Sequence, residues 1–569
     1  MVYADIVIDA PSPKILSYGI TPEHLPSVVP GQLVEVPLGN RAVMGIVWAL
    51  RKRLNQAVAP TSIRPLNRVL SNGPWADPST RKLAELIAHE TDEPIGTCLF
   101  RLLPPPGKRS IPTLTGELTP SSRRGTTYHV IAASRLRTKT YVDLIVRAHR
   151  SGEQSLIVAP LHRFGDLQNQ LSSTELLVTS VSAADAPTSQ RRTASAFAKG
   201  EIDVLIATRH AAGWPAARLG LVIVDDALHP AHVDDQRPYL DTASLATLRQ
   251  QAAPHVHLLI GSGVASSGMV RAEQTGRARR LQSAEPSTPV LLAKLPANRL
   301  LTDAADRLLD SASPDRPVVC IAPAHGVGGS LRCSACDFIF RCPVCSALPQ
   351  LTRASTSYHC RTCGDNAPWP DRCPSCRSTT LVARGIGVEA VTEAIATQRG
   401  GTLPAGVRVT TELAIAELTG TESVIFTFAD SPLIAPDLRR GERFLSAISD
   451  AIGQATRVII QTTEPSAIHW RLLGRGRAEA ERELLTGRGD YQLPPFRRRI
   501  TAWGPKESTP ALTPPEHATA YDTTIGARHA IIEWLVEPRF YLGVLQSIRA
   551  ALPRDWRVRI DSVLEHSAW

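Results

Sequence analysis

Residues 219–229 read LGLVIVDDALH, a run of six apolar or glycine residues that ends on two aspartates. A short, continuously apolar run of this kind is typical of a strand buried on both faces of a parallel sheet. Five further runs of the same texture lie nearby, separated by segments of helical pattern: YHVIAAS, SLIVAP, TELLVTSV, DVLIATR and VHLLIGS. This alternation predicts an α/β domain over residues 116–285, with helices on both faces of the sheet.

A second set of buried strands follows farther along the chain. Its members are RPVVCIAP, VRVTT, SVIFTFAD and RVIIQTT. They predict a second α/β domain in two pieces, residues 286–332 and 385–465. The segment between the pieces, residues 333–384, interrupts this domain after its first expected strand.

The inserted segment holds eight of the ten cysteines, in four C-x-x-C pairs: Cys333/Cys336, Cys342/Cys345, Cys360/Cys363 and Cys373/Cys376. Two such pairs supply the four thiolates of a tetrahedral zinc site, so eight thiolates predict two Zn²⁺ ions. Large apolar residues are few here, so metal binding should supply much of the folding energy. Full thiolate ligation leaves no open position, which favours a structural over a catalytic role. The other two cysteines, Cys98 and Cys320, are interpreted as small buried residues.

The two ends of the chain differ in pattern from the middle. Residues 1–72 alternate apolar and polar residues between turn signals, which predicts a small β domain. Residues 73–115 predict a helical or winged-helix domain, with Ser79 and Thr80 capping its helix. Residues 466–569 are expected to form an α+β C-terminal domain with helices at 479–487, 518–536 and 542–552.

Composition limits the class of protein. The 569 residues are 43% hydrophobic and 20% charged, which is typical of a globular chain of several domains. The net charge of +10 permits a nucleic-acid partner without establishing one. We found no apolar run long enough for a membrane span, and the start of the chain lacks the pattern of a signal peptide. The sequence therefore predicts a cytoplasmic protein without a membrane partner.

In a nucleotide-binding protein, a phosphate-binding loop after the first strand would end at the positions of Lys139 and Thr140. The two glycines of such a loop are replaced by Ala133 and Thr138, so a normal phosphate cradle is not expected. Asp225 and Asp226 end a strand, where Mg²⁺ ligands commonly lie. The alternative is a pair of solvated or capping aspartates.

These pieces, in this order, resemble the PriA family of replication restart proteins. The resemblance covers nearly the whole chain. Its strongest part is the cysteine segment followed by residues 384–389, RGIGVE. Further matching stretches are residues 29–41, 200–214, 219–229, 429–443 and 491–496.

The resemblance implies a fold and a set of sites. The expected parts are a DNA 3′-end-binding domain, a winged helix, two RecA-like helicase lobes, the zinc module and the C-terminal domain. It also assigns the ligands of each zinc: Cys333, Cys336, Cys373 and Cys376 bind the first, and Cys342, Cys345, Cys360 and Cys363 bind the second. Tyr18, Arg41 and Arg64 are the expected DNA contacts, although Tyr18 can equally be a packed strand residue.

The helicase motifs of this family are degraded here in four places. They read RLRTKT, DDAL, GSGV and, at residues 450–457, DAIGQATR. Gln454 stands where the last motif has an arginine, so a charge expected near a γ-phosphate is missing. The nucleotide residues Lys139, Thr140, Asp225 and Asp226 are thus interpreted as vestigial. ATP and Mg²⁺ become doubtful cofactors, and no catalytic residue is assigned.

The sequence is compatible with three functions. The first is a restart protein that binds forked DNA with a 3′ end and helps reload the replication machinery without unwinding DNA. Its partners in the family are single-stranded DNA-binding protein and helicase-loading proteins. The second is an active 3′→5′ helicase with divergent motifs. The third is a zinc-containing scaffold that binds only proteins.

Overall fold

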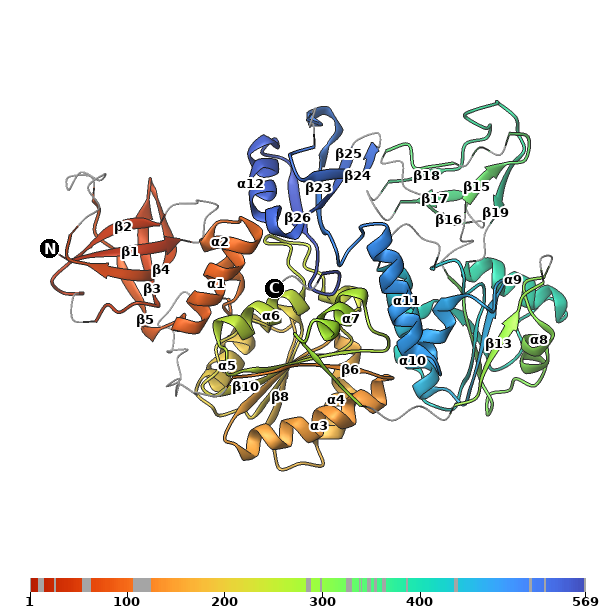
Figure 1. The fold of residues 1–569 in the computed structure, drawn as a ribbon, viewed down its shortest axis with the longest axis horizontal. Helices are drawn as coiled ribbons and strands as arrows, with labels where there is room; N and C mark the ends of the chain where they lie inside the picture. Colours follow the sequence, from red (N-terminus) through yellow and green to blue (C-terminus); the bar gives the residue numbers. More distant parts are fainter. Residues whose placement is uncertain are drawn as a thin grey trace.

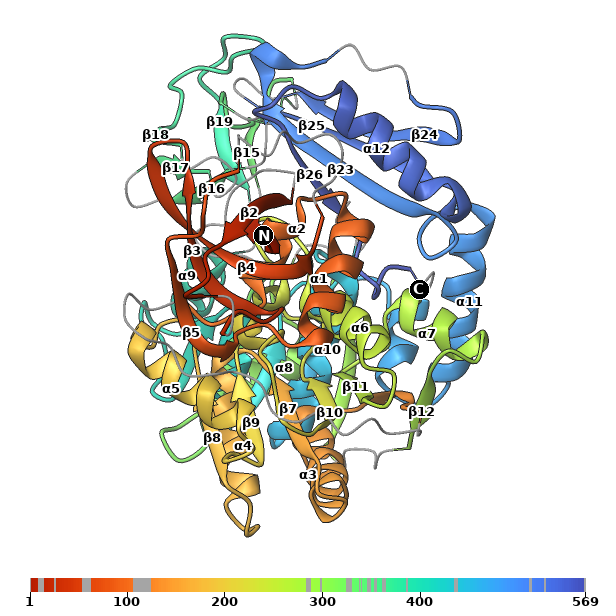
Figure 2. The ribbon, with the colours of Figure 1, turned by 90° about the vertical axis from the view of Figure 1, so that its left-hand side faces the viewer.

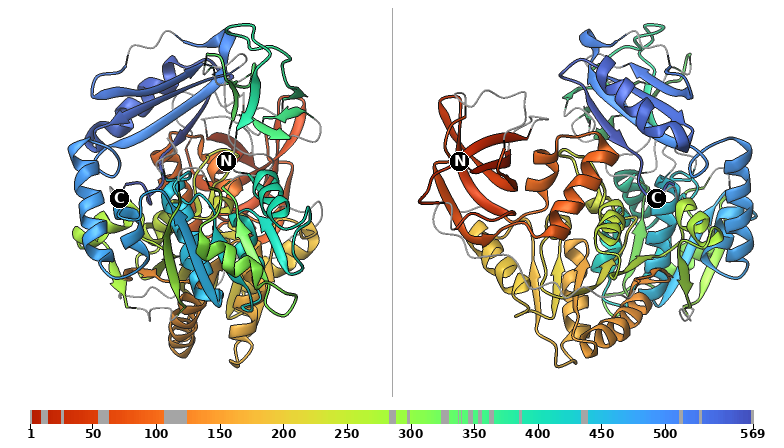
Figure 3. Two further views of the ribbon diagram at one scale, coloured as in Figure 1. Left: turned by 90° about the vertical axis from the view of Figure 1, so that its right-hand side faces the viewer. Right: turned by 60° about the vertical axis from the view of Figure 1, so that its left-hand side comes forward.

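The fold was obtained as a computed structural model. It describes residues 2–8, 15–24, 27–53, 63–105, 124–282, 288–296, 299–323, 330–336, 338, 340–344, 349–352, 356–360, 365–384, 387–433, 439–510, 514–525 and 529–566. In Figure 1 the N-terminal sheet lies at the left, two parallel sheets occupy the lower centre and right, and the C-terminal sheet lies above them. The C-terminal sheet stays at the top, and the parallel sheets below it, in the views of Figure 2 and Figure 3.

The N-terminal part is an antiparallel sheet of order β2-β1-β4-β3-β5. Its strands are β1 (Val2–Ile8), β2 (Leu16–Ile20), β3 (Gln32–Leu38), β4 (Arg41–Arg51) and β5 (Arg68–Pro74). Two helices follow, α1 (Pro78–Thr91) and α2 (Ile95–Arg101). The side chain of Asp77 accepts the amide hydrogen of Thr80 at 2.6 Å. The cap of α1 is therefore Asp77, earlier than the predicted Ser79 and Thr80, because Pro78 fits the first helical position.

The first lobe, residues 124–282, is the predicted parallel sheet with helices on both faces. The strand order is β12-β6-β11-β10-β7-β9-β8, and the pairs are parallel. Its strands are β6 (Thr127–Ile131), β7 (Gln154–Val158), β8 (Val178–Val181), β9 (Val204–Ala207), β10 (Leu219–Val224), β11 (His257–Ser262) and β12 (Arg279–Leu281). Its helices are α3 (Ser134–Arg150), α4 (Phe164–Leu171), α5 (Pro187–Ala198), α6 (Thr242–Ala252) and α7 (Ser267–Gln274).

The second lobe, residues 288–323 and 387–462, is another parallel sheet, of order β13-β22-β21-β14-β20. Its strands are β13 (Val290–Lys294), β14 (Val318–Ile321), β20 (Val407–Thr410), β21 (Ser423–Phe426) and β22 (Arg457–Thr462). Its helices are α8 (Asp303–Asp310), α9 (Val388–Gln398) and α10 (Arg440–Gln454). The cysteine segment thus follows the second strand of the lobe, since β13 precedes β14 and the sequence reading missed it.

The cysteine segment forms two small antiparallel sheets. They consist of β15 (Ser330–Cys333) with β19 (Leu381–Arg384), and of β16 (Gln350–Thr352), β17 (Ser357–His359) and β18 (Asn366–Pro368). A separate small core that includes Leu331, Phe340 and Tyr358 lies among them. The segment is therefore a module of its own, next to the second lobe in Figure 1.

The C-terminal part contains α11 (Arg477–Asp490), α12 (Tyr541–Ala551) and an antiparallel sheet of order β24-β25-β23-β26. The strands are β23 (Arg498–Pro505), β24 (Ala518–Ile525), β25 (His529–Val536) and β26 (Arg557–Ile560). The helix predicted for residues 518–536 is wrong, because this stretch is the hairpin of β24 and β25. Ala530, Ile532 and Trp534 are buried in alternation, which is the period of a strand.

One continuous hydrophobic core joins several of these parts. It runs from α1 and α2 through one face of each parallel sheet to the C-terminal sheet. The parts therefore pack as one body, and a cleft between the two lobes opens where α3 faces α10.

Candidate functional site: the cleft between the lobes

Helix α3 begins almost at once after β6, with only Ala132 and Ala133 between them. A phosphate-binding loop needs a longer glycine-containing turn whose amides surround the phosphates, so there is no such loop here. Lys139 and Thr140 lie in the second turn of the helix. Lys139 is exposed, and the Thr140 hydroxyl donates to the Leu136 carbonyl at 3.4 Å.

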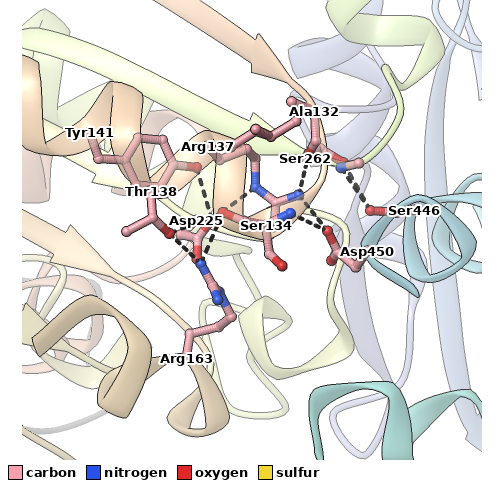
Figure 4. Close-up of polar contacts among 12 residues, drawn as sticks. Ala132, Ser134, Arg137, Thr138, Tyr141, Arg163, Asp225, Ser262, Ser446 and Asp450 are labelled. Carbon is pink, nitrogen blue, oxygen red and sulfur yellow. Dashed lines mark hydrogen bonds and ion pairs between the residues drawn. The ribbon is translucent and has the colours of Figure 1, made fainter. Parts of the chain in front are cut away.

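The side chain of Arg137 occupies the space under this strand–helix junction and is fully buried. Its Nη1 donates to the Ala132 carbonyl at 2.7 Å, and its Nε donates to Asp225 Oδ1 at 3.1 Å. The same Nη1 also donates to Asp450 Oδ1 at 3.0 Å, across the cleft (Figure 4). A guanidinium of the chain itself thus bridges the two lobes below the cleft.

Asp225, at the carboxyl end of β10, is the hub of this network (Figure 4). Besides Arg137, it accepts from Tyr141 Oη at 2.8 Å and from Arg163 Nε at 2.7 Å. Burial alone would raise the pKa of the Asp225 carboxyl, but Arg163 and Arg137 hold it well below its usual range. Both oxygens are committed to cations of the protein, so Asp225 is neither a free Mg²⁺ ligand nor the solvated aspartate of the alternative interpretation.

Asp450 of α10 closes the network from the second lobe. Its Oδ1 accepts the main-chain amide of Ser134, the first residue of α3, at 2.7 Å. Gln454 Nε2 donates to the Ser134 hydroxyl at 3.1 Å. A helix N-terminus favours an anion, so a carboxylate of the second lobe takes a place where a bound phosphate would be stabilised.

The lobes also touch through small residues. A Cβ on Gly453 of α10 would lie 2.3 Å from the Cβ of Ala133, so only glycine permits this approach. Gly263, which follows β11, donates its amide to Ser446 Oγ at 2.9 Å. Close packing and hydrogen bonds therefore hold the two lobes together in this arrangement.

Asp226, the next residue, makes none of the hydrogen bonds that join Asp225 to Arg137, Tyr141 and Arg163. Its backbone has a φ of 52°, a left-handed conformation that is uncommon for a residue other than glycine. Its carboxylate lines the interlobe cleft of about 650 Å³ together with His162 and His229. The described contacts include no hydrogen bond or ion pair of this carboxylate.

A second candidate site is the four-cysteine cluster of the inserted module. The sulfurs of Cys333, Cys336, Cys373 and Cys376 all lie within 4.8 Å of one another. The Sγ atoms of Cys333 and Cys376 are 3.5 Å apart, and those of Cys336 and Cys373 are 3.7 Å apart. Zinc–sulfur bonds of about 2.3 Å in a tetrahedron place sulfurs about 3.8 Å apart. The cluster therefore fits a metal ion such as zinc.

The other predicted ligand set is only partly described. Cys342 and Cys360 are buried in the core of the module, whereas Cys345 and Cys363 lie outside the described residues. Outside the module, Cys98 and Cys320 expose no surface, which confirms their interpretation as buried residues.

The expected DNA contacts lie around the turn between β3 and β4. Tyr18 is 5% exposed, packs in the core of the N-terminal sheet and donates its hydroxyl to the Pro37 carbonyl at 3.0 Å. Its ring is thus a packed strand residue, and stacking on a base does not agree with this position. Arg41 and Arg64 are exposed, and Arg64 Nη1 donates to the Gly39 carbonyl at 2.7 Å. The turn therefore carries two arginines on its surface.

Several residues of the cleft belong to no motif that can be recognised in the sequence. Arg163 and Tyr141 gave no signal, because their role depends on the packing of α3 and of residues 161–163 against β10. His162 and His229 were missed for the same reason. Asp450 lies in a degraded motif that was noted only for Gln454.

In the part of the chain that the structure describes, none of the helices has the length and apolar character that a membrane span needs.

Known proteins share parts of this architecture. Residues 5–104 match the family model of a "3'DNA-binding domain (3'BD)". The match runs from β1 through α2. It therefore crosses the domain boundary that the sequence predicts after residue 72. The fold is thus that of a multidomain α/β protein with a DNA 3′-end-binding domain at its start.

Curated relatives extend the similarity into the lobes. The replication restart protein PriA of Chlamydia muridarum is 23% identical over 431 residues, covering 64% of this chain and 55% of the relative. The probable replication restart protein PriA of Mycobacterium tuberculosis is 26% identical over 427 residues, covering 65% of this chain and 63% of the relative. The chain therefore spans less than two thirds of the length of each. Together with the domain match, these relatives show that the chain is similar to replication restart proteins named PriA over about two thirds of its own length.

Among solved structures, the DUF1998 helicase MrfA aligns with 61% of this chain and 48% of its own, at 9% identity and a TM-score of 0.31. Domain 2 of the DEAD-box helicase Mss116p, bound to an RNA duplex, aligns with 28% of this chain and 65% of its own, at 14% identity and a TM-score of 0.22.

Proposed function

We propose that this chain is a replication restart protein that binds forked or branched DNA with a 3′ end, helps reload the replication machinery and does not turn over ATP. The match of residues 5–104 to a 3′ DNA-binding domain carries the DNA-binding half of the proposal. The curated relatives, named as replication restart proteins, support the restart role.

Arg137 carries the other half of the proposal. A nucleotide-driven motor needs amides and a lysine around the phosphates and a free carboxylate for Mg²⁺. Here Arg137 fills the space beneath the strand–helix junction, Asp450 takes the α3 amide, and both oxygens of Asp225 are bound to cations of the chain. A nucleotide would have to break this buried network before it could bind.

The finer assignments belong to the same proposal. The proposed domains are residues 1–72 (DNA-end binding), 73–115 (helical or winged helix), 116–285 (first helicase-like lobe), 286–332 with 385–465 (second lobe), 333–384 (double-zinc module) and 466–569 (C-terminal domain). The described part of 73–115 holds α1 and α2, and the described residues include no strand of a wing. Single-stranded DNA-binding protein and helicase-loading proteins are the proposed protein partners.

A fork titration with ATPase measured in the same tube tests the proposal. Fluorescence anisotropy with a forked DNA that presents a 3′ end, a blunt duplex and a single strand should show preference for the fork. Affinity should fall steeply with salt, because arginine–phosphate contacts release counterions. DNA-stimulated phosphate release should be absent.

Two results would overturn the proposal in different ways. Magnesium-dependent unwinding that is lost in Lys139→Ala would restore an active motor. Absence of measurable DNA affinity at low salt would leave a scaffold that binds only proteins.

A further inference from the structure

Two histidines and an aspartate meet at one edge of the first lobe. His162 lies in the short 3-10 helix Leu161–Arg163 after β7, and Asp226 and His229 follow β10. Strands β7 and β10 are parallel neighbours, so the segments after them emerge side by side. One ligand atom of each of the three residues lies within 4.8 Å of the others, and the two rings are 5.1 Å apart between centroids.

Asp226 supplies an independent reason to expect a cation here. The residue is 8% exposed, and its carboxylate has no hydrogen-bond or ion-pair partner among the described contacts. Arg137 acts on this carboxylate through charge without donating a hydrogen bond to it. A buried carboxylate that accepts no hydrogen bond is unfavourable, so a directly bound cation would stabilise it. The described hydrogen bonds of the buried Arg137 and Arg163 go to other groups, and the Nε of each donates to Asp225.

The left-handed backbone of Asp226 supports the same conclusion. Such a conformation persists only where the surrounding structure fixes it, and it is common at ligand sites. It separates two consecutive aspartates, so that Asp225 joins the buried network and Asp226 faces the histidines in the cleft.

We propose that His162, Asp226 and His229 bind one divalent transition-metal ion of the Zn²⁺ class in the cleft between the lobes. Two imidazoles and a carboxylate suit zinc and its neighbours, whereas Mg²⁺ and Ca²⁺ prefer oxygen ligands. Three protein ligands leave a position for water or an anionic group from the cleft, unlike the closed four-cysteine cluster. The site depends neither on DNA binding nor on the loss of ATP turnover.

Binding requires small rearrangements of the side chains. Metal–ligand bonds of about 2.0–2.2 Å place ligand atoms roughly 3.3 Å apart, so the three side chains must close around the ion. His229 Nδ1 accepts the amide hydrogen of Ala231 at 3.1 Å. When the ring coordinates through Nε2, its proton resides on Nδ1 and this hydrogen bond is given up.

Metal counting on the full chain tests the site. Protein with its cysteine sites loaded is dialysed against micromolar Zn²⁺, and bound zinc is measured by mass spectrometry. Wild type should hold one equivalent more than His162→Ala, His229→Ala or Asp226→Asn. His149→Ala, which removes an exposed histidine of α3, is the matched control and should equal wild type. Equal zinc in all five proteins would overturn the proposal.

A spectroscopic measurement separates a lost ligand from a misfolded variant. Co²⁺ bound by nitrogen and oxygen gives weak visible bands, whereas thiolate ligation adds intense sulfur-to-metal charge transfer. Co²⁺ titrated into zinc-loaded wild type should give the weak bands alone, and the three variants should lack them while keeping their cysteine-bound zinc. Only thiolate-type bands, or bands that persist in all three variants, would contradict the site.

Discussion

Arg137 Nε lies 3.1 Å from Asp225 Oδ1, and neither side chain exposes any surface. The residues come from α3 and from the end of β10, which in a nucleotide-driven motor would hold the phosphates and their metal ion. Here the positive charge that meets the aspartate belongs to the chain. The pair also reaches the second lobe, because Arg137 Nη1 bonds Asp450.

Removal of the Arg137 guanidinium should destabilise the protein strongly. Arg137→Met leaves Asp225 and Asp450 buried with fewer partners, and breaking a buried ion pair on one side costs about 3–5 kcal/mol. The free energy of unfolding, measured from urea denaturation, should fall by this amount. Arg135→Met, on the exposed side of the same helix, should change it by less than about 0.5 kcal/mol.

A double variant distinguishes the ion pair from simple packing. Arg137→Met combined with Asp225→Asn should recover part of the loss, because the buried negative charge disappears together with its partner. Additive losses would show that the Arg137–Asp225 pair contributes nothing beyond the separate contacts of the two side chains.

Asp450 should control opening of the cleft at α3. Asp450→Ala frees the Ser134 amide and one contact of Arg137, so hydrogen exchange should accelerate in residues 134–138. Ser446→Ala removes a different contact between the lobes and should accelerate exchange at Gly263 instead. Unchanged exchange at residues 134–138 in Asp450→Ala would mean that this carboxylate does not hold the lobes together.

His232 should make the first lobe sensitive to acid. Burial lowers the pKa of His232 to about 4, and its ring nitrogen Nε2 donates to the Asp225 carbonyl at 2.8 Å. The unfolded residue titrates near 6.5, so the neutral form contributes stability that is complete above pH 6.5 and is lost as the pH falls toward 4.

The measurement is the free energy of unfolding between pH 6.5 and pH 4. His232→Gln keeps an amide donor but does not titrate. The slope of the free energy of unfolding against pH should therefore decrease by up to about 1.4 kcal/mol per pH unit, which corresponds to one proton. His149→Ala should keep the wild-type slope. The same slope in His232→Gln and wild type would show that His232 does not govern acid sensitivity.

The sequence predicted the parallel sheets well, because runs such as residues 219–224 are apolar throughout and can only be buried on both faces. It failed for the hairpin β24–β25, where the apolar residues of 518–536 fit a helical period as well as a strand. It also assigned no strand to residues 290–294 of the second lobe, since Val290 and Leu291 of β13 lie in an edge strand and remain exposed.

The site shows a different limit of the sequence. Ala133 and Thr138, in place of the two glycines of a phosphate-binding loop, predicted that no phosphate cradle forms, and the short β6–α3 connection agrees. Arg137 supplies the positive charge that a bound metal ion would otherwise place next to Asp225. This arrangement depends on tertiary packing, because Asp225 and Asp450 are distant from Arg137 in the sequence. The pairing of His162 with His229 likewise follows from strand order rather than from any local motif.

The cysteine module should unfold without zinc while the lobes stay folded. Its small core is separate from the core that joins the lobes, so metal binding is its main source of stability. We expect two cysteine-bound zinc ions per chain. Cys376→Ser should lose one of them, and Cys98→Ala, a buried cysteine outside the module, should lose none. Chelation should make residues 330–384 sensitive to protease first. Retention of both zinc ions in Cys376→Ser would refute this ligand assignment.

The two arginines at the β3–β4 turn should contribute to DNA affinity through phosphate charge. Arg64→Ala and Arg41→Ala should each weaken fork binding and lower the slope of log affinity against log salt by about one.

Tyr18→Phe removes only a hydroxyl that is bonded to the Pro37 carbonyl, and its ring stays in the core. This variant should therefore lose about 1 kcal/mol of folding stability and bind the fork as wild type does. Anisotropy titrations at several salt concentrations make the comparison. Loss of fork binding in Tyr18→Phe, together with normal binding in both arginine variants, would contradict this prediction. It would show that DNA contacts the strand that contains Tyr18 and not the arginines at the turn.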